Sequence, residues 1–235
     1  MPATGFLPSR NGLRFRNAFP SGPVLSLRSI GLPRVGIGNA RGGLCGGMVF
    51  AALDYYEAGC PVPPQATPPR ADSLMFRYLV RRLFASFALP RGVLRYQRYM
   101  ARPNGNHRRF GATQLGLSWL TIVQHWPDIR RSLDAGRPTP LGLVVARGLN
   151  PVELGRNHVV LAYDYRLTDD NLVIQVYDPN TGPADDVYLA LSLAAPHRST
   201  SITHDIDIGH AIRGFFPLRY RPRNPPGALI RDGSS

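Results

Sequence analysis

Cys45 is the residue with the strongest claim to chemistry, because it stands among glycines at the start of a predicted helix. The stretch GLCGGMVFAALDYYEAG, residues 43–59, is apolar on most sides from Met48 onward and ends at Gly59, as expected of a buried helix. Free N–H groups and the helix dipole in a first turn favour a thiolate, which is the nucleophilic form of cysteine. Four glycines would let a substrate backbone approach the sulfur: Gly42, Gly43, Gly46 and Gly47. Cys45 is therefore a candidate nucleophile, and a plain buried thiol beside a tight turn is the alternative.

A base for this thiol is expected from a β-hairpin in the second half of the chain. The strand-like runs 157–167 and 172–179 flank the polar turn TDDN, residues 168–171. Pairing about this turn places His158 opposite Asp178, and cross-strand neighbours have Cβ atoms about 5 Å apart. The carboxylate would then hold one imidazole nitrogen and leave the other for the thiol. Asn180, two residues further on, is an alternative orienting group.

Other polar groups make weaker candidates. The stretch THDIDIGH contains four residues of metal-binding type: His204, Asp205, Asp207 and His210. Without a third convincing ligand cluster, we expect no metal and no cofactor. His125 and His197 fit surface or packing positions, and the glycines of GLPRVGIGNARGG lack the spacing of a phosphate-binding loop.

The elements that must position these residues occur with helices first and strands second. Helices are expected over 48–59, 71–87 and 116–135, the second capped by Asp72 or Ser73 and the last interrupted at Pro127, and residues 91–100 could form a further helix. Strands are expected over 141–146, in the hairpin and over 214–222, whereas 187–193 fits a strand or a short helix and 195–210 a loop. This order indicates an α+β fold. We expect an extended Pro/Gly/Arg-rich arm over 1–38, one domain over 39–222 and a flexible tail over 223–235.

Composition restricts the class of protein. The 235 residues suit one domain, and 43% hydrophobic residues can form a substantial core. The net charge is +13, but all 28 basic residues are arginine, which is typical of a GC-rich coding bias, so we expect no specific nucleic-acid partner. Cys45 and Cys60 lie about 22 Å apart along one helix, too far for a disulfide. No signal peptide or membrane span is recognisable, so a cytoplasmic location is expected, with export by another route left open.

Four motifs in order resemble the papain-like cysteine peptidase superfamily, and are most similar to its bacterial double-glycine-peptidase-like branch. They are the helix-start cysteine, LDAGRPTPLGLVV, NHVVLAYDY and VYDPN, and together they span about residues 39–182. The resemblance implies a papain-like fold with Cys45 as nucleophile, His158 as general base and acid, and Asp178 as orienting group. That family also uses a polar side chain, usually Gln, several residues before the cysteine as an oxyanion-hole donor. Asn39 is the matching residue here, and the backbone N–H of Cys45 would be the second donor.

The expected function is hydrolysis of peptide or amide bonds in a peptide-like substrate through an acyl-enzyme. Two alternatives stay open at this point. The same triad could transfer the acyl group to an amine, or the domain could be catalytically silent and bind a peptide or polyanionic partner through its arginines. Leader peptidases of the branch are fused to transporters, a role that does not carry over because no membrane span is seen here. The sequence leaves the oligomeric state open.

Overall fold

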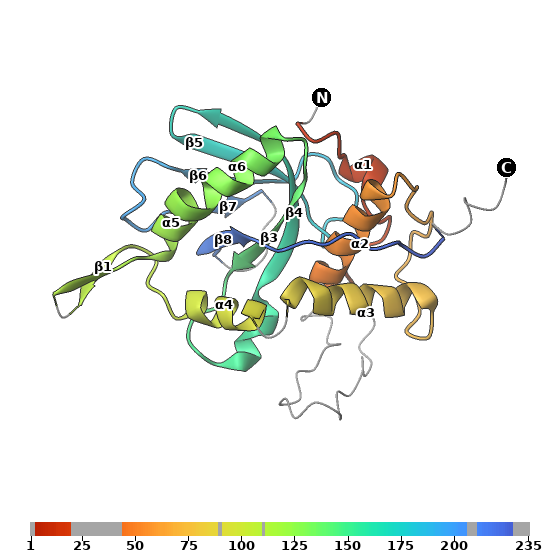
Figure 1. Ribbon diagram of the computed structural model, residues 1–235, viewed down its shortest axis with the longest axis horizontal. Helices are drawn as coiled ribbons and strands as arrows, with labels where there is room; N and C mark the ends of the chain where they lie inside the picture. The colour runs from red at the N-terminus through yellow and green to blue at the C-terminus, as the bar shows by residue number, and fades with distance from the viewer. Residues whose placement is uncertain (1–2, 20–43, 89–90, 110, 206–210, 228–235) are drawn as a thin grey trace.

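A curled antiparallel sheet with helices packed around it forms the protein, which confirms the α+β expectation (Figure 1). The computed structural model describes residues 3–19, 44–88, 91–109, 111–205 and 211–227. Two sets of helices lie on different sides of the sheet. In Figure 1 the helices of the first half gather on the right and at the bottom, and the later helices run across the upper left.

The expected helices agree closely with the structure, whereas α1 and η2 were not expected. The helices are α1 (Pro8–Asn11), α2 (Cys45–Glu57), α3 (Leu74–Phe87), α4 (Arg91–Met100), α5 (Leu117–Trp119), the π-helix η1 (Leu120–His125), α6 (Trp126–Asp134) and the 3-10 helix η2 (Pro151–Arg156). Ser73 rather than Asp72 caps α3, because its hydroxyl accepts from the Phe76 N–H at 3.1 Å. The interruption expected at Pro127 coincides with the change from η1 to α6, since proline lacks the N–H that would continue the helical ladder.

Six strands make the main sheet. In chain order they are β3 (Thr139–Val144), β4 (His158–Thr168), β5 (Asn171–Tyr177), β6 (Tyr188–Ser192), β7 (Thr203–His204) and β8 (Gly214–Pro217). Their spatial order is β7-β6-β5-β4-β3-β8, and each neighbouring pair is antiparallel. A separate hairpin joins β1 (His107–Arg109) to β2 (Ala112–Gln114). The stretch 187–193 is thus a strand, and the stretch expected to be a loop over 195–210 contains β7.

The central hairpin has the predicted turn. Thr168 pairs with Asn171, and Asp169 between them has a φ of 52°, in the left-handed region that tight turns use.

A β-bulge near residue 163 shifts the register of this hairpin away from the turn. Beyond the bulge, Leu161 pairs with Tyr177, so Asp178 stands two positions away from the residue directly across from His158. The expectation that His158 and Asp178 are direct cross-strand partners was therefore wrong. They are diagonal neighbours, whose backbones lie about 7–8 Å apart, so the two side chains must reach across this distance to interact.

The core holds α2 against the sheet. Val159 and Leu161 of β4 pack with Val49, Phe50 and Leu53 of α2, and all five are buried. On the other face of the sheet, buried side chains of β4 and β5 pack with α6, among them Val160, Ile174, Ile129 and Leu133. Because β4 is held between two apolar layers, its first residue and the start of α2 have fixed positions relative to each other.

Glycines in the first turn of α2 serve helix packing. A Cβ on Gly46 would lie 2.3 Å from the Ser86 hydroxyl, and one on Gly47 would lie 2.2 Å from the Leu79 carbonyl oxygen of α3. We expected these glycines to open space for a substrate, which was the wrong reason for them: they allow α3 to approach α2. Gly42 and Gly43 lie outside the described residues.

The described part of the N-terminal arm, residues 3–19, packs into the core. Phe6, Leu13 and Phe15 are each at most 2% exposed, and α1 contacts α2. The described part of the arm therefore adds buried surface to the domain, contrary to our expectation of an extended arm. At the other end, the Arg223 N–H donates to Asp54 at 2.9 Å, so the start of the expected tail is also attached. Among the described residues, no helix has the length and apolar character needed to cross a membrane.

Candidate active site

Cys45 is the first residue of α2, as the sequence predicted. Leu44 occupies the N-cap without a side-chain cap, and Cys45 is 9% exposed in an apolar cluster with Val49 and Val159. The sulfur thus lies at the positive end of a 13-residue helix whose first N–H groups have no helical partners. Both cysteines are free thiols, so the expectation of no disulfide with Cys60 is confirmed.

His158 connects Cys45 to Asp178. Its Nε2 atom lies 2.8 Å from Asp178 Oδ1, and Cys45 is close enough to the ring to raise the pKa of His158. Since Nε2 is engaged by the carboxylate, Nδ1 is the nitrogen available to the sulfur. The imidazole is 10% exposed and the carboxylate fully buried. The structure therefore brings together the three residues that the sequence had selected from α2, β4 and the end of β5.

The electrostatic surroundings of His158 and Asp178 favour the charged forms of both side chains. Burial lowers the pKa of His158, but the Asp178 carboxylate and Cys45 outweigh burial, and the pKa is raised well above its ordinary value. Burial likewise raises the pKa of Asp178, and the charge and hydrogen bond of His158, with help from His204, reverse this and hold it well below its usual range. An imidazolium beside an ionised carboxylate is the state that both directions describe.

Asn180 does not orient His158 in this structure. Its backbone N–H donates to Asp178 Oδ1 at 2.7 Å, while its side-chain oxygen accepts from Asn17 Nδ2 at 3.0 Å. Asp178 is thus the orienting group in the geometry, and the main chain of Asn180 supports it.

His204 is a member of the site that our sequence reasoning did not assign to it. Its Nε2 atom lies 3.0 Å from Asp178 Oδ2, its Nδ1 atom lies 3.2 Å from Asp205 Oδ1, and its side chain is 2% exposed. The Asp178 carboxylate is therefore held between two imidazoles, one on each oxygen. The sequence carried a faint signal, since histidine and aspartate were adjacent in THDIDIGH, but the two-residue strand β7 is too short for a pattern to place it beside β6.

Asn17 is a second residue that sequence reasoning missed. Its side-chain oxygen accepts from the Leu44 N–H at 2.8 Å, directly before the cysteine, and its own N–H donates to the Pro179 carbonyl at 2.8 Å. With its bond to Asn180, this one side chain ties the chain before Cys45 to the chain after Asp178. These hydrogen bonds of Asn17 hold the described part of the arm on the domain.

The remaining candidate residues either lie outside the described residues or serve packing. Asn39, Asp207 and His210 lie outside the described residues, and within those residues no three metal-binding side chains gather. His125 is a packing residue: it is buried, its Nε2 lies 2.8 Å from the Tyr99 hydroxyl, and burial lowers its pKa to about 4.

A cleft of about 590 Å³ opens at the same end of the sheet as His158. Its wall includes Val145 and Ala146, whose N–H groups donate to the side chain of Asn157, the residue before His158. Arg147 also lines it, and together with burial its charge lowers the pKa of Arg213 to about 10. The cleft thus offers space for a ligand, with positive charge, at this end of the sheet, although Cys45, His158 and Asp178 are not among its lining residues.

Comparisons with protein-family models, curated proteins and solved structures found no match for this chain. The interpretation of the site therefore rests on its own geometry and on the resemblance of its motifs.

Proposed function

We propose that the protein is a thiol hydrolase of papain-like type that cleaves peptide or amide bonds through a Cys45–His158–Asp178 triad. The observation that carries the proposal is that His158 Nε2 lies 2.8 Å from Asp178 Oδ1 while Cys45 is close enough to raise the pKa of the same imidazole. A nucleophile, a base and a group that orients the base are the three parts that this chemistry needs.

In the proposed reaction, the Cys45 thiolate attacks the substrate carbonyl carbon while His158 carries the proton as an imidazolium. Asp178 stabilises that cation and holds the ring so that Nδ1 faces the sulfur. His158 then gives its proton to the leaving amine, which leaves a thioester on Cys45. Water attacks this thioester, with His158 accepting the proton of the water, and the free acid departs.

Stabilisation of the tetrahedral oxyanion is the remaining requirement. The backbone N–H of Cys45 lies in the first turn of α2, where N–H groups have no helical acceptor, so it is one proposed donor. Asn39 is the proposed second donor, on the resemblance alone. The cleft of about 590 Å³ at the end of the sheet where His158 lies is the proposed substrate site.

Digestion of a peptide library tests this function. Wild-type protein is incubated with a tryptic peptide library of known sequences, and new termini are identified by mass spectrometry. We expect new termini with wild type and with Cys60→Ala, and none with Cys45→Ala, because only Cys45 has the base. New termini that persist with Cys45→Ala, or no new termini with any of the three proteins, would overturn the proposal.

A further inference from the structure

The positive charge of this chain is concentrated in one stretch. Residues 73–127 contain nine arginines and neither aspartate nor glutamate, so they carry most of the net charge of +13. A coding bias explains why arginine replaces lysine, but it does not explain the absence of acidic residues from 55 consecutive positions. The stretch covers α3, α4, the β1–β2 hairpin, α5 and η1.

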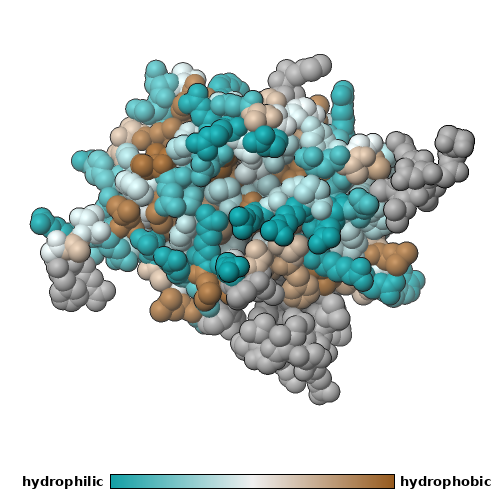
Figure 2. Space-filling model, viewed as in Figure 1, coloured by the Kyte–Doolittle hydropathy of each residue, from teal (hydrophilic) through white to brown (hydrophobic). Residues whose placement is uncertain are grey.

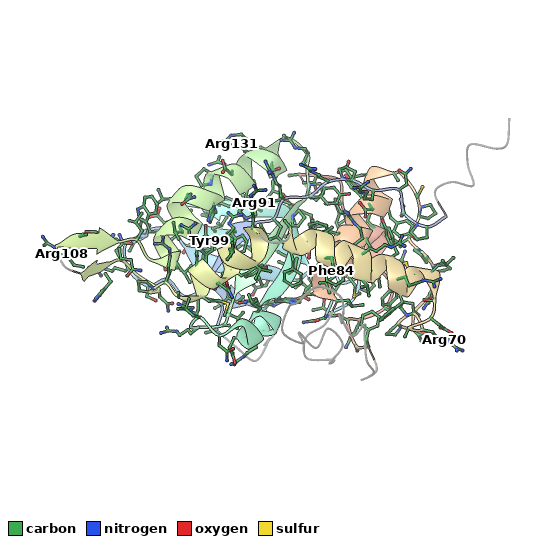
Figure 3. The ribbon with its side chains drawn as sticks, turned by 60° about the horizontal axis from the view of Figure 1, so that its bottom comes forward. Arg70, Phe84, Arg91, Tyr99, Arg108 and Arg131 are labelled. Atoms are coloured by element: carbon green, nitrogen blue, oxygen red, sulfur yellow. The ribbon has the colours of Figure 1, made fainter. Side chains whose placement is uncertain are left out.

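On α4 these arginines share one face. Arg91, Arg95 and Arg98 follow one another at intervals of four and three residues, which keeps them on one side of α4, and Arg102 lies two residues beyond its last residue, Met100. All four line a groove of about 580 Å³. Figure 3 turns this side of the molecule forward, with Arg91 and Tyr99 labelled near the centre.

A second groove of about 350 Å³ continues the first and adds apolar side chains. The two grooves share Leu94, Arg98 and Arg102, and the second also reaches Leu149. Leu94 is 54% and Leu149 70% exposed, which is unusual for leucine. In Figure 2, brown residues are visible beside teal ones along the lower edge of the molecule, where α4 lies. We call this surface the α4 arginine face; its residues are Arg91, Leu94, Arg95, Arg98, Arg102 and Leu149.

The charges of this face are not neutralised within the part of the chain that the structure describes. No acidic residue there lines either groove, and none of the four arginines forms an ion pair. Arg95 lies over the Phe216 ring at 4.4 Å and donates to the Pro217 carbonyl, and Arg102 donates to the Leu115 carbonyl. These contacts fix the positions of two guanidinium groups without cancelling their charge, so an anionic surface would complement the face.

The chemistry of the face distinguishes between anionic partners. Single-stranded nucleic acids are held by exposed aromatic rings on which bases stack, but Tyr99 in the groove is only 9% exposed. Exposed leucines among arginines are instead typical of a helix that lies in the interface of a bilayer, where the cations meet headgroup phosphates and the apolar side chains enter the acyl boundary.

We propose that the α4 arginine face binds the surface of an anionic lipid bilayer. The four arginines would contact lipid phosphates, and Leu94 and Leu149 would enter the boundary between headgroups and acyl chains. Such binding is peripheral and reversible, and it is independent of the proposed hydrolase activity. Each arginine held near an anionic surface strengthens binding by about fivefold.

Flotation of the full-length protein with vesicles tests the proposal. The vesicles are pure phosphatidylcholine or phosphatidylcholine with about 30% phosphatidylglycerol, in about 0.15 M salt where screening is physiological. We expect binding to the anionic vesicles only. Arg91→Gln with Arg98→Gln should weaken it by about twentyfold, and Leu94→Gln with Leu149→Gln by about tenfold because apolar contact is lost.

A charge-matched control keeps the result specific to the face. Arg108→Gln with Arg131→Gln removes the same charge from the β1–β2 hairpin, which projects to the left in Figure 1, and from α6, which lies in the upper part of that view while α4 lies at the bottom. This variant should change vesicle binding by less than about twofold because screening limits the range of exposed charges. Thermal melts of all variants are expected to match wild type, since every substituted side chain is exposed.

Duplex RNA is the competing partner in the same experiment. If the face served nucleic acid, the protein would bind the duplex at the same salt and the two leucine substitutions would leave that binding unchanged. Duplex binding without vesicle binding would overturn the proposal. So would equal binding to neutral and anionic vesicles, full vesicle binding by the leucine variant, or a control variant that loses as much affinity as the α4 variant.

Discussion

Asp178→Asn is the perturbation that probes the site most sharply, because it removes one charge and keeps the shape of the side chain. The carboxylate is fully buried and accepts from His158 and from the Asn180 N–H on Oδ1, and it faces His204 on Oδ2. The amide can keep the first two bonds through its oxygen. Its nitrogen would face His204 Nε2, which can accept if the proton of that ring moves to Nδ1, where the Asp205 carboxylate lies 3.2 Å away. The fold is therefore expected to survive.

The cost should appear in the stability of the imidazolium. Two opposite unit charges about 4 Å apart interact by about 4 kcal/mol at an effective dielectric constant of about 20, which sets a ceiling of about a thousandfold on the rate. The neutral hydrogen bond of the amide recovers part of this interaction energy. We therefore expect kcat/KM to fall by about ten- to a thousandfold, which corresponds to an increase of about 1.4 to 4 kcal/mol in the barrier. That is less than the roughly ten-thousandfold loss seen for the equivalent change in a serine enzyme, because the proposed mechanism starts from a thiolate and needs no proton transfer for attack.

The assay compares kcat/KM of wild type, Asp178→Asn and Asn180→Ala on one fluorogenic peptide taken from the library digestion. Asn180→Ala is the matched control, because its backbone N–H still supports Asp178 and only the contact with Asn17 is lost. We expect it to stay within about threefold of wild type, which corresponds to well under 1 kcal/mol. Thermal melts first establish that both variants fold. An undiminished Asp178→Asn together with a damaged Asn180→Ala would refute the assignment of Asp178.

Further predictions concern the residues around the triad. His204→Gln should keep most activity, because its amide nitrogen can still donate toward Asp178. The side chain of His204→Asn is too short to do so, and this variant should lower kcat by about tenfold, or about 1.4 kcal/mol of barrier, with little change in KM. Equal losses in kcat for both variants would contradict this role of His204. Gly47→Ala should lower the free energy of unfolding, measured by urea denaturation, by about 1–3 kcal/mol because the added Cβ clashes with the Leu79 carbonyl. The loss should exceed that of Gly59→Ala, a position with open space around it but a φ of +61°. The reverse order would show that α2 and α3 can separate easily. Because the pKa of His158 is raised on folding, its contribution to stability is complete below about pH 6.5 and is lost as the pH rises toward the folded value. The difference in unfolding free energy between wild type and His158→Gln should therefore shrink from pH 6 to pH 9, and a difference that grows would contradict the sign.

Much of the fold could be predicted from local pattern. The apolar run of α2, the cap of α3, the GRPTP break before β3 and the TDDN turn each depend on neighbours in sequence, and each was confirmed. The turn was enough to bring His158 near Asp178. The register was not: the Thr168–Asn171 pairing alone would place position 181 across from His158, and the bulge near residue 163 changes this to Asn180, which is still two positions from Asp178.

The parts of the site that could not be predicted depend on distant contacts. Asn17 and His204 reach the triad from segments 28 residues before Cys45 and 26 residues after Asp178, with hydrogen bonds as their only signature. The role of Gly46 and Gly47 was misassigned for the same reason, since the helix they approach is separated from α2 by a proline-rich connector. Residues whose function is set by tertiary contacts leave no local pattern.

The most direct measurement of the central claim is the order in which the two cysteines react with iodoacetamide at about pH 6, where an unactivated thiol with a pKa of about 8.5 is almost fully protonated. Access alone favours Cys60, which is partly exposed, over Cys45, which is 9% exposed. An imidazolium partner reverses that order, so we predict that mass spectrometry finds Cys45 alkylated before Cys60. In His158→Gln, Cys60 should be alkylated faster than Cys45. Faster labelling of Cys60 in the wild type, or a Cys45 rate that His158→Gln leaves unchanged, would contradict the account.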